Sequence, residues 1–212
     1  MAAESAPLPQ QPWHEHRVHV HASWLVSMQS VAWTATAGPA AIAVGLLSSS
    51  SVLVALGAIG FVDGLGSAAL AYHFRHAVQH EALSDRLERL AHLVVLVGLL
   101  VVGLGAVAGG AFRLAGGQRS ESSAVGIGLA VVSLTVLSVL SKRKRAIAAL
   151  VRSPALRSDG HLSAVGATQA AITTVGSITT AVGWRWADPA AAIVVGCVAV
   201  GVSFQTWIAG GE

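Results

Sequence analysis

Charged residues are scarce in this chain: Asp, Glu, Lys and Arg make up 11% of its 212 residues, whereas 54% are hydrophobic. A soluble domain carries about a quarter charged residues, so much of this chain is expected to lie in lipid. Cysteine is nearly absent. The single Cys197 excludes an intramolecular disulfide and a metal cage built from cysteines. The formal net charge of +3 is small, and the clustered basic residues suit a membrane surface rather than nucleic acid.

Enzyme motifs are also missing. The sequence has no phosphate-binding loop, no GxSxG and no HExxH. We therefore expect that the protein is not an enzyme and carries no prosthetic group.

Long apolar segments dominate what is present. A membrane-spanning helix needs roughly 20 apolar residues, and these segments lack the alternating pattern of barrel strands. The sequence predicts an all-α membrane protein with a six-helix transmembrane domain over residues 23–209, the helices lying at about 24–47, 52–72, 90–112, 123–140, 160–182 and 187–208. Residues 1–22 are polar, with Pro12 among several prolines, and are expected to form a disordered cytoplasmic tail without a helix. We expect no soluble domain after the sixth helix.

Basic residues predict the orientation of the helices. They gather in the second and fourth loops, at Arg75, Arg86, Arg89, Lys142, Arg143, Lys144, Arg145, Arg152 and Arg157. The opposite side has only Arg113, Arg119 and Arg185. Both termini are therefore expected in the cytoplasm. We interpret the fourth, strongly basic loop as a topology determinant near anionic lipid headgroups.

Asp63 is the only carboxylate near the centre of a long apolar segment. An ionisable side chain at this depth costs several kcal/mol unless it faces the bundle interior or a watery cavity. Asp63 is therefore predicted to serve an ion or proton site, with Ser67 one turn later on the same helix face. The alternative is a structural carboxylate that is hydrogen-bonded inside the bundle.

The fifth segment has a polar face, because small and hydroxyl-bearing residues recur every three or four positions from Asp159 through Ser163 to Thr180. Such a face either lines a path for ions or packs tightly against another helix. Asp159 is either part of that path or a charge near a helix N-terminus, where the helix dipole favours it.

Histidines also cluster, as His14, His16, His19 and His21 in the tail. A short histidine-rich tract can gather metal ions weakly, and its alternative is a solvated polar tail.

Four stretches give the chain a resemblance to a known family: Asp63-x-x-x-Ser67 with Arg75, residues 85–91, residues 138–159, and the GWRWADP run at 183–189. Together they resemble the cation diffusion facilitators, six-helix transporters of divalent metal ions. The similarity is greatest to the short bacterial branch that lacks the cytoplasmic C-terminal domain.

The resemblance implies a mid-membrane metal site of four side chains, two from the second helix and two from the fifth. Zinc favours a four-coordinate cage of this kind. By spacing, the four positions fall at Ile59, Asp63, Leu162 and Gly166, and only Asp63 offers a ligand. A slip of one residue in the fifth helix brings in His161.

Three outcomes fit this departure from the family pattern. The metal site is rearranged around Asp63, His161 and Asp159; or the cargo is a proton or a monovalent cation; or the protein is a transport-inactive relative with a structural or regulatory role. From the first outcome we predict Asp63, His161 and Asp159 as the metal ligands. The resemblance further implies zinc or another divalent cation as the transported ion, exchange against protons, a homodimer, and a multi-pass location in the cell membrane, the bacterial inner membrane.

Overall fold

The computed structural model describes residues 12–76, 81–117, 120–121, 123–151 and 154–209, and in these ranges it contains α-helices and no strand. The six helices are α1 (Pro12–Leu47), α2 (Ser51–His76), α3 (Glu81–Ala115), α4 (Ala124–Val151), α5 (Pro154–Ala181) and α6 (Ala187–Ala209). The expected all-α, six-helix fold is confirmed.

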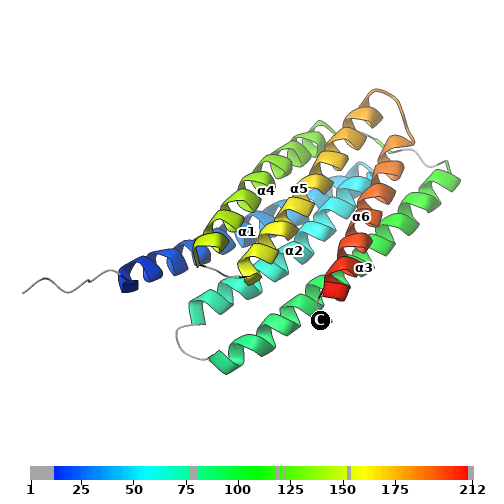
Figure 1. Ribbon diagram of the computed structural model, residues 1–212. Coiled ribbons are helices and arrows are strands. Elements are labelled where there is room, and N and C mark those ends of the chain that lie inside the picture. Colours follow the sequence, from blue (N-terminus) through cyan, green and yellow to red (C-terminus); the bar gives the residue numbers. More distant parts are fainter. Residues whose placement is uncertain (1–11, 77–80, 118–119, 122, 152–153, 210–212) are drawn as a thin grey trace, which may run out of the picture.

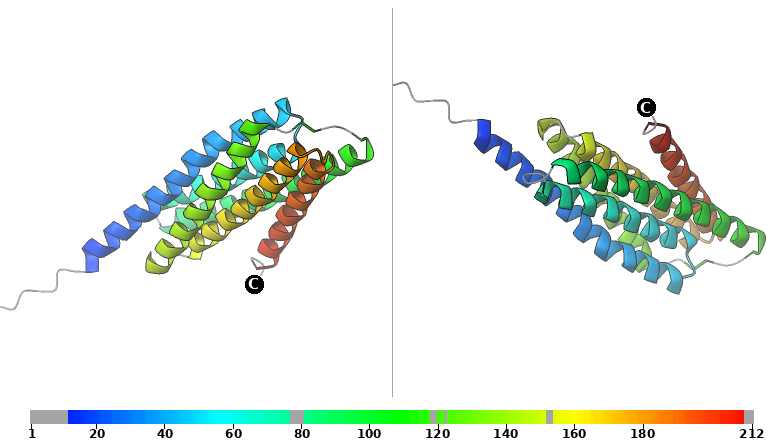
Figure 2. Two further views of the ribbon diagram at one scale, coloured as in Figure 1. Left: turned by 90° about the horizontal axis from the view of Figure 1, so that it is seen from above. Right: turned by 90° about the horizontal axis from the view of Figure 1, so that it is seen from below.

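The helices run up and down in one bundle, so that the start of α1 and the end of α6 lie toward the same end (Figure 1). The most extensive packing joins α1 to α2, α4 to α5, and α3 to α6. Toward its C-terminal end, α6 diverges from the other helices (Figure 2). Helices α1, α2, α4 and α5 supply most of the residues around the site described below.

Glycines allow the close approach of α3 and α6. A Cβ added at Gly103 would lie 2.9 Å from the carbonyl oxygen of Gly196, and one added at Gly110 would lie 2.7 Å from that of Pro189. Small residues at such crossings let helix backbones touch, as is common in membranes.

Within the described residues, five helices are long and apolar enough to cross a membrane, namely α1, α2, α3, α4 and α6. The remaining helix, α5, contains the predicted polar face. Ser163, Gln169, Thr173 and Thr180 on that face are all buried in the bundle. A polar face is tolerated at this depth because it contacts protein instead of lipid. The chain is therefore a multi-pass membrane protein.

Four helix boundaries differ from our expectations. Helix α3 begins at Glu81 and not near residue 90, and α5 begins at Pro154 and not near residue 160, so Arg86, Arg89 and Arg157 also belong to helices. Helix α1 begins at Pro12, so residues 12–22 are not a helix-free tail. Proline is favoured in the first turn of a helix, because its missing N–H would have no partner there. Helix α4 continues to Val151, so residues 142–145 belong to a helix and not to a loop. Residues 1–11 lie outside the described part of the chain.

Asp188 connects three segments at the end of the bundle opposite the termini. Its carboxylate accepts hydrogen bonds from the Ser50 hydroxyl, from the Ser51 backbone N–H at 2.8 Å and from the Ser120 hydroxyl at 3.1 Å. The side chain is 1% exposed. It thereby ties the start of α6 to the α1–α2 turn and to the residues before α4.

Candidate cation site

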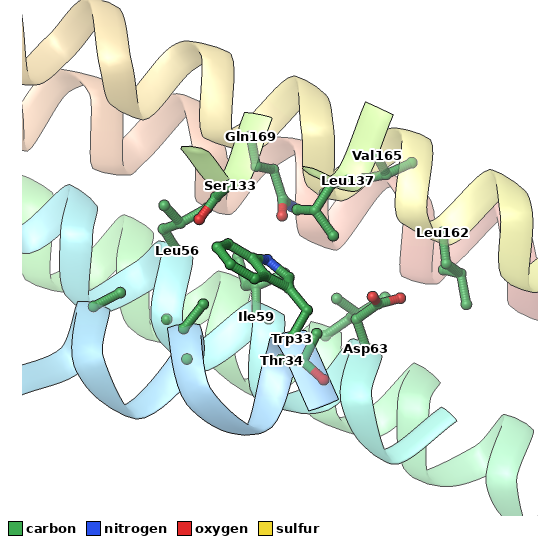
Figure 3. A pocket seen from close by; sticks show the side chains of 17 residues that line it. Trp33, Thr34, Leu56, Ile59, Asp63, Ser133, Leu137, Leu162, Val165 and Gln169 are labelled. Atoms are coloured by element: carbon green, nitrogen blue, oxygen red, sulfur yellow. The ribbon is translucent and has the colours of Figure 1, made fainter. Parts of the chain in front are cut away.

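A cavity of about 40 Å³ lies among α1, α2, α4 and α5 (Figure 3), and Leu99 of α3 also belongs to its lining. Its volume leaves room for water molecules, since one water needs about 10–15 Å³ when the volume is measured in this way. Most of the lining is apolar. Asp63, Gln169, Thr34 and Ser133 supply polar groups to its wall.

All four positions that the resemblance assigned to a metal site line this one cavity: Ile59 and Asp63 from α2, and Leu162 and Gly166 from α5. The spacing argument therefore selected residues that face one another across the bundle. Three of these four side chains carry no ligand atom, so the cavity has one carboxylate where the family pattern would place four ligands.

Asp63 is 8% exposed, and its Oδ1 atom is buried and has no hydrogen-bond partner among the residues that the structure describes. A buried carboxylate oxygen normally has a partner, and an orphan costs several kcal/mol. The unused oxygen at the cavity wall is the feature expected of a group that receives a cation or a proton.

Gln169 is a second polar group of this cavity. The sequence indicated it only as one alternative, Gln169 or Ala170, on the polar face of the fifth segment. Its side chain projects from α5 into the cavity, beside the indole ring of Trp33 (Figure 3). It is fully buried, and neither its amide oxygen nor its amide nitrogen has a partner within the described part of the chain. Its place on the polar face of α5 was the available signal.

Lys144 and Asp159 form a buried ion pair that the sequence did not predict. Lys144 Nζ lies 2.8 Å from Asp159 Oδ2, as a contact between charges rather than an aligned hydrogen bond. The lysine is 0% exposed and the aspartate 4%. Lys144 donates its hydrogen bonds to three serine hydroxyls, those of Ser30 at 2.9 Å, Ser67 at 3.1 Å and Ser163 at 2.9 Å.

The sequences of α4 and α5 both allow this ion pair to be buried. On α4, Lys144 shares one face with the buried residues Leu140, Ser141 and Ala148, at the three- and four-residue spacing of a helix. On α5, Gly160 makes room, since a Cβ there would lie 3.2 Å from that of Lys144. The Ser141 hydroxyl donates to the Gly160 carbonyl at 2.8 Å and fixes the two helices together.

The ion pair also acts on the cavity. Ser67 donates a hydrogen bond to Asp159 Oδ1 at 3.0 Å, and Ser67 lies one turn beyond Asp63 on α2. The charges of Lys144 and Asp159 both influence the Asp63 carboxyl. The three ionisable side chains therefore form one electrostatic group, with Asp63 at the cavity.

Our three predicted metal ligands are not brought together as one site. Asp63 and Asp159 are buried near the same lysine, whereas His161 is exposed. No cluster of three or more His, Cys, Asp or Glu side chains suited to a metal ion occurs among the described residues. His21 is exposed in α1, and the side chains of His14, His16 and His19 lie outside the described part of the structure.

A multi-pass helical bundle that buries a carboxylate with an unpartnered oxygen beside an ion pair is typical of a protein that moves ions across the bilayer. A family model for the cation efflux transmembrane domain matches residues 28–209. The chain belongs to the cation efflux family, whose members transport divalent cations, and the resemblance inferred from its motifs is confirmed. A search of curated proteins found no match.

Proposed function

We propose that this protein exports a divalent cation across the membrane in exchange for protons, and that Asp63 binds the cation and a proton in turn. The observation that carries the proposal is the buried Asp63 oxygen, which has no partner in the described part of the chain. Asp63 lines a cavity whose wall includes all four positions expected for the metal site. A carboxylate must lose its proton before it can bind a metal, so the two compete for the same oxygen.

Zinc is the cation that the resemblance implies and the first to test. Asp63 cannot complete a zinc coordination shell alone, because zinc takes about four ligands. Gln169, Thr34 and Ser133 offer oxygen atoms on the same wall, and the cavity has room for water. An oxygen-rich shell of this kind suits harder divalent cations such as Mg²⁺ and Mn²⁺ as well as zinc.

The experiment is transport into proteoliposomes that hold a zinc-sensitive dye, with a pH gradient as the driving force. We expect a zinc signal that depends on the gradient and is lost in Asp63→Asn. Glu121→Gln is the matched control, because it also removes one carboxylate but at an exposed position. The absence of metal-dependent transport in the wild-type protein, or full transport by Asp63→Asn, would refute the proposal.

A second function is favoured by Ile59, Leu162 and Gly166, the three cavity positions without a ligand atom. In this alternative the protein has kept the family fold as a structural or regulatory partner and does not transport. Metal titration of the purified protein separates the two functions. A saturable site that is lost in Asp63→Asn supports transport, whereas no binding at millimolar metal supports the second function. We expect a homodimer in either case, as the resemblance implies.

A further inference from the structure

The Lys144 ammonium group is held like a bound ion. Four oxygen atoms from α1, α2 and α5 surround it at 2.8–3.1 Å, one from the Asp159 carboxylate and three from serine hydroxyls. All of these side chains are buried. An ammonium group at this depth is tolerated only when its charge is paired and its three N–H donors are satisfied, and this cage does both.

The groups that surround the ammonium group do not depend on the lysine for their positions. Ser30, Ser67 and Ser163 come from three different helices, yet their hydroxyls converge on one point. Ser67 also donates to Asp159 Oδ1 and so holds the carboxylate in place without the lysine. A small cation with no side chain attached would find the same neutralising charge and the same three acceptor oxygens.

The cage lies next to the Asp63 cavity along the same helices. Ser67 and Ser163 lie on the same two helices as Asp63 and Leu162, which line the cavity wall. Along α2 and α5 the cage is displaced from the cavity toward the end of the bundle that holds both termini. The Lys144–Asp159 pair therefore lies between the Asp63 cavity and that end of α2 and α5.

We propose that Ser30, Ser67, Asp159 and Ser163 form a second cation site, specific for a monovalent cation of ammonium size, and that Lys144 fills it as a tethered cation. By occupying this site, Lys144 prevents a second free ion from binding beside Asp63. The consequence for transport rests on the proposed function, but the binding site itself does not.

The test uses the full-length protein in detergent and its variant Lys144→Ala. This substitution removes the ammonium group from the cage and keeps the four oxygen atoms that surround it. Thermal unfolding is followed in ammonium, potassium, sodium or choline chloride at constant ionic strength. We expect ammonium to raise the unfolding temperature of Lys144→Ala in a saturable manner, by about 3–5 °C at ten times the dissociation constant. Choline, which is too large for the cage, should have no effect.

Matched variants make the result specific. The unfolding temperatures of the wild-type protein and of Lys144→Ala/Asp159→Asn should be the same in ammonium and in choline. In the wild-type protein Lys144 occupies the cage, and in the double variant the cage has lost the negative charge of Asp159. Lys142→Ala removes an exposed lysine two residues away on the same helix and should behave as the wild-type protein.

Whether the Lys144→Ala variant folds in each salt also tests the proposed site. Recovery of a folded Lys144→Ala variant only in ammonium or potassium would support the site. Equal unfolding temperatures in all four salts would overturn it. So would a Lys144→Ala variant that stays unfolded in every salt, whether or not the double variant folds. Because no transport is measured, failure of the proposed function would leave this result unchanged.

Discussion

Replacing Lys144 by methionine removes a buried positive charge while keeping a side chain of similar length. The structure shows what remains behind. Asp159, at 4% exposure, loses its neutralising partner and keeps one hydrogen bond from Ser67. The serine hydroxyls lose their donor but can bond to one another, since Ser30 and Ser67 lie 3.2 Å apart. The main cost is therefore the unpaired carboxylate.

Breaking a buried ion pair by removing one partner costs about 3–5 kcal/mol, because a charge is left uncompensated. We expect Lys144→Met to lose this amount of unfolding free energy. Asp159→Asn leaves the lysine unpaired and should cost a similar amount. The double variant removes both charges, and since buried ion pairs contribute little net stability, it should lie within about 1 kcal/mol of the wild-type protein.

The assay is reversible unfolding in mixed micelles with increasing sodium dodecyl sulfate, followed by circular dichroism. The wild-type protein, both single variants and the double variant complete a double-mutant cycle. Lys142→Met is the control for removing a lysine from α4, and as an exposed substitution it should change stability by less than about 0.5 kcal/mol.

Two results would refute this reasoning. A loss below about 1 kcal/mol in Lys144→Met would mean that the ammonium group is hydrated or unpaired in the protein. A double variant that is as unstable as the sum of the two single variants would mean that the side chains act separately and do not form a pair.

Three further predictions concern other contacts. Asp188→Ala should cost about 3 kcal/mol in the same assay, because a carboxylate that accepts three hydrogen bonds is lost, whereas exposed Glu121→Ala should be neutral; an equal effect of both would contradict this. Gly160→Ala should cost about 1–3 kcal/mol of unfolding free energy, because the added Cβ would lie 2.8 Å from a side-chain carbon of α4. Gly105→Ala has open space around it and should stabilise α3 by up to about 1 kcal/mol. Equal changes in stability for the two variants would exclude the crowding argument. Gln169→Leu should raise stability by about 1–2 kcal/mol, because it removes buried polar atoms without partners, and should weaken zinc transport in the dye assay; unchanged transport would exclude the amide from the cation path.

The fold followed from the sequence because long apolar runs leave helices as the only spanning element here. The boundary errors have local causes. Pro12 was treated as a helix breaker, although proline is well suited to the first turn of a helix, where it stands in α1. Helix α4 was ended too early, because residues 142–145 are basic and were assigned to a loop.

The site was predictable only in part. Asp63 stood out because no other carboxylate lay in such apolar surroundings. Lys144 did not, because it is one of four consecutive basic residues, and only the rotation of α4 determines which one points inward. Its spacing of four from Leu140 was the signal that the sequence offered. His161 and Asp159 could not both face the cavity, since residues two apart in a helix point in nearly opposite directions.

The structure leaves a choice between two roles for Asp159, a metal ligand or the counter-ion of Lys144, and net charge decides between them. With Asp63 ionised, the wild-type charges of Asp63, Asp159 and Lys144 sum to −1. The sum is −2 in Lys144→Met, 0 in Asp159→Asn and again −1 in the double variant Lys144→Met/Asp159→Asn.

If Asp159 is only a counter-ion, affinity for a divalent cation follows this sum, because the site at Asp63 responds to the summed charges of its neighbours. Zinc should then bind most tightly to Lys144→Met, most weakly to Asp159→Asn, and about equally to the wild-type protein and the double variant. Isothermal titration of the last two, which are both expected to be stable, is the decisive comparison. A much weaker affinity in the double variant would refute the counter-ion role and make Asp159 a direct ligand beside Asp63.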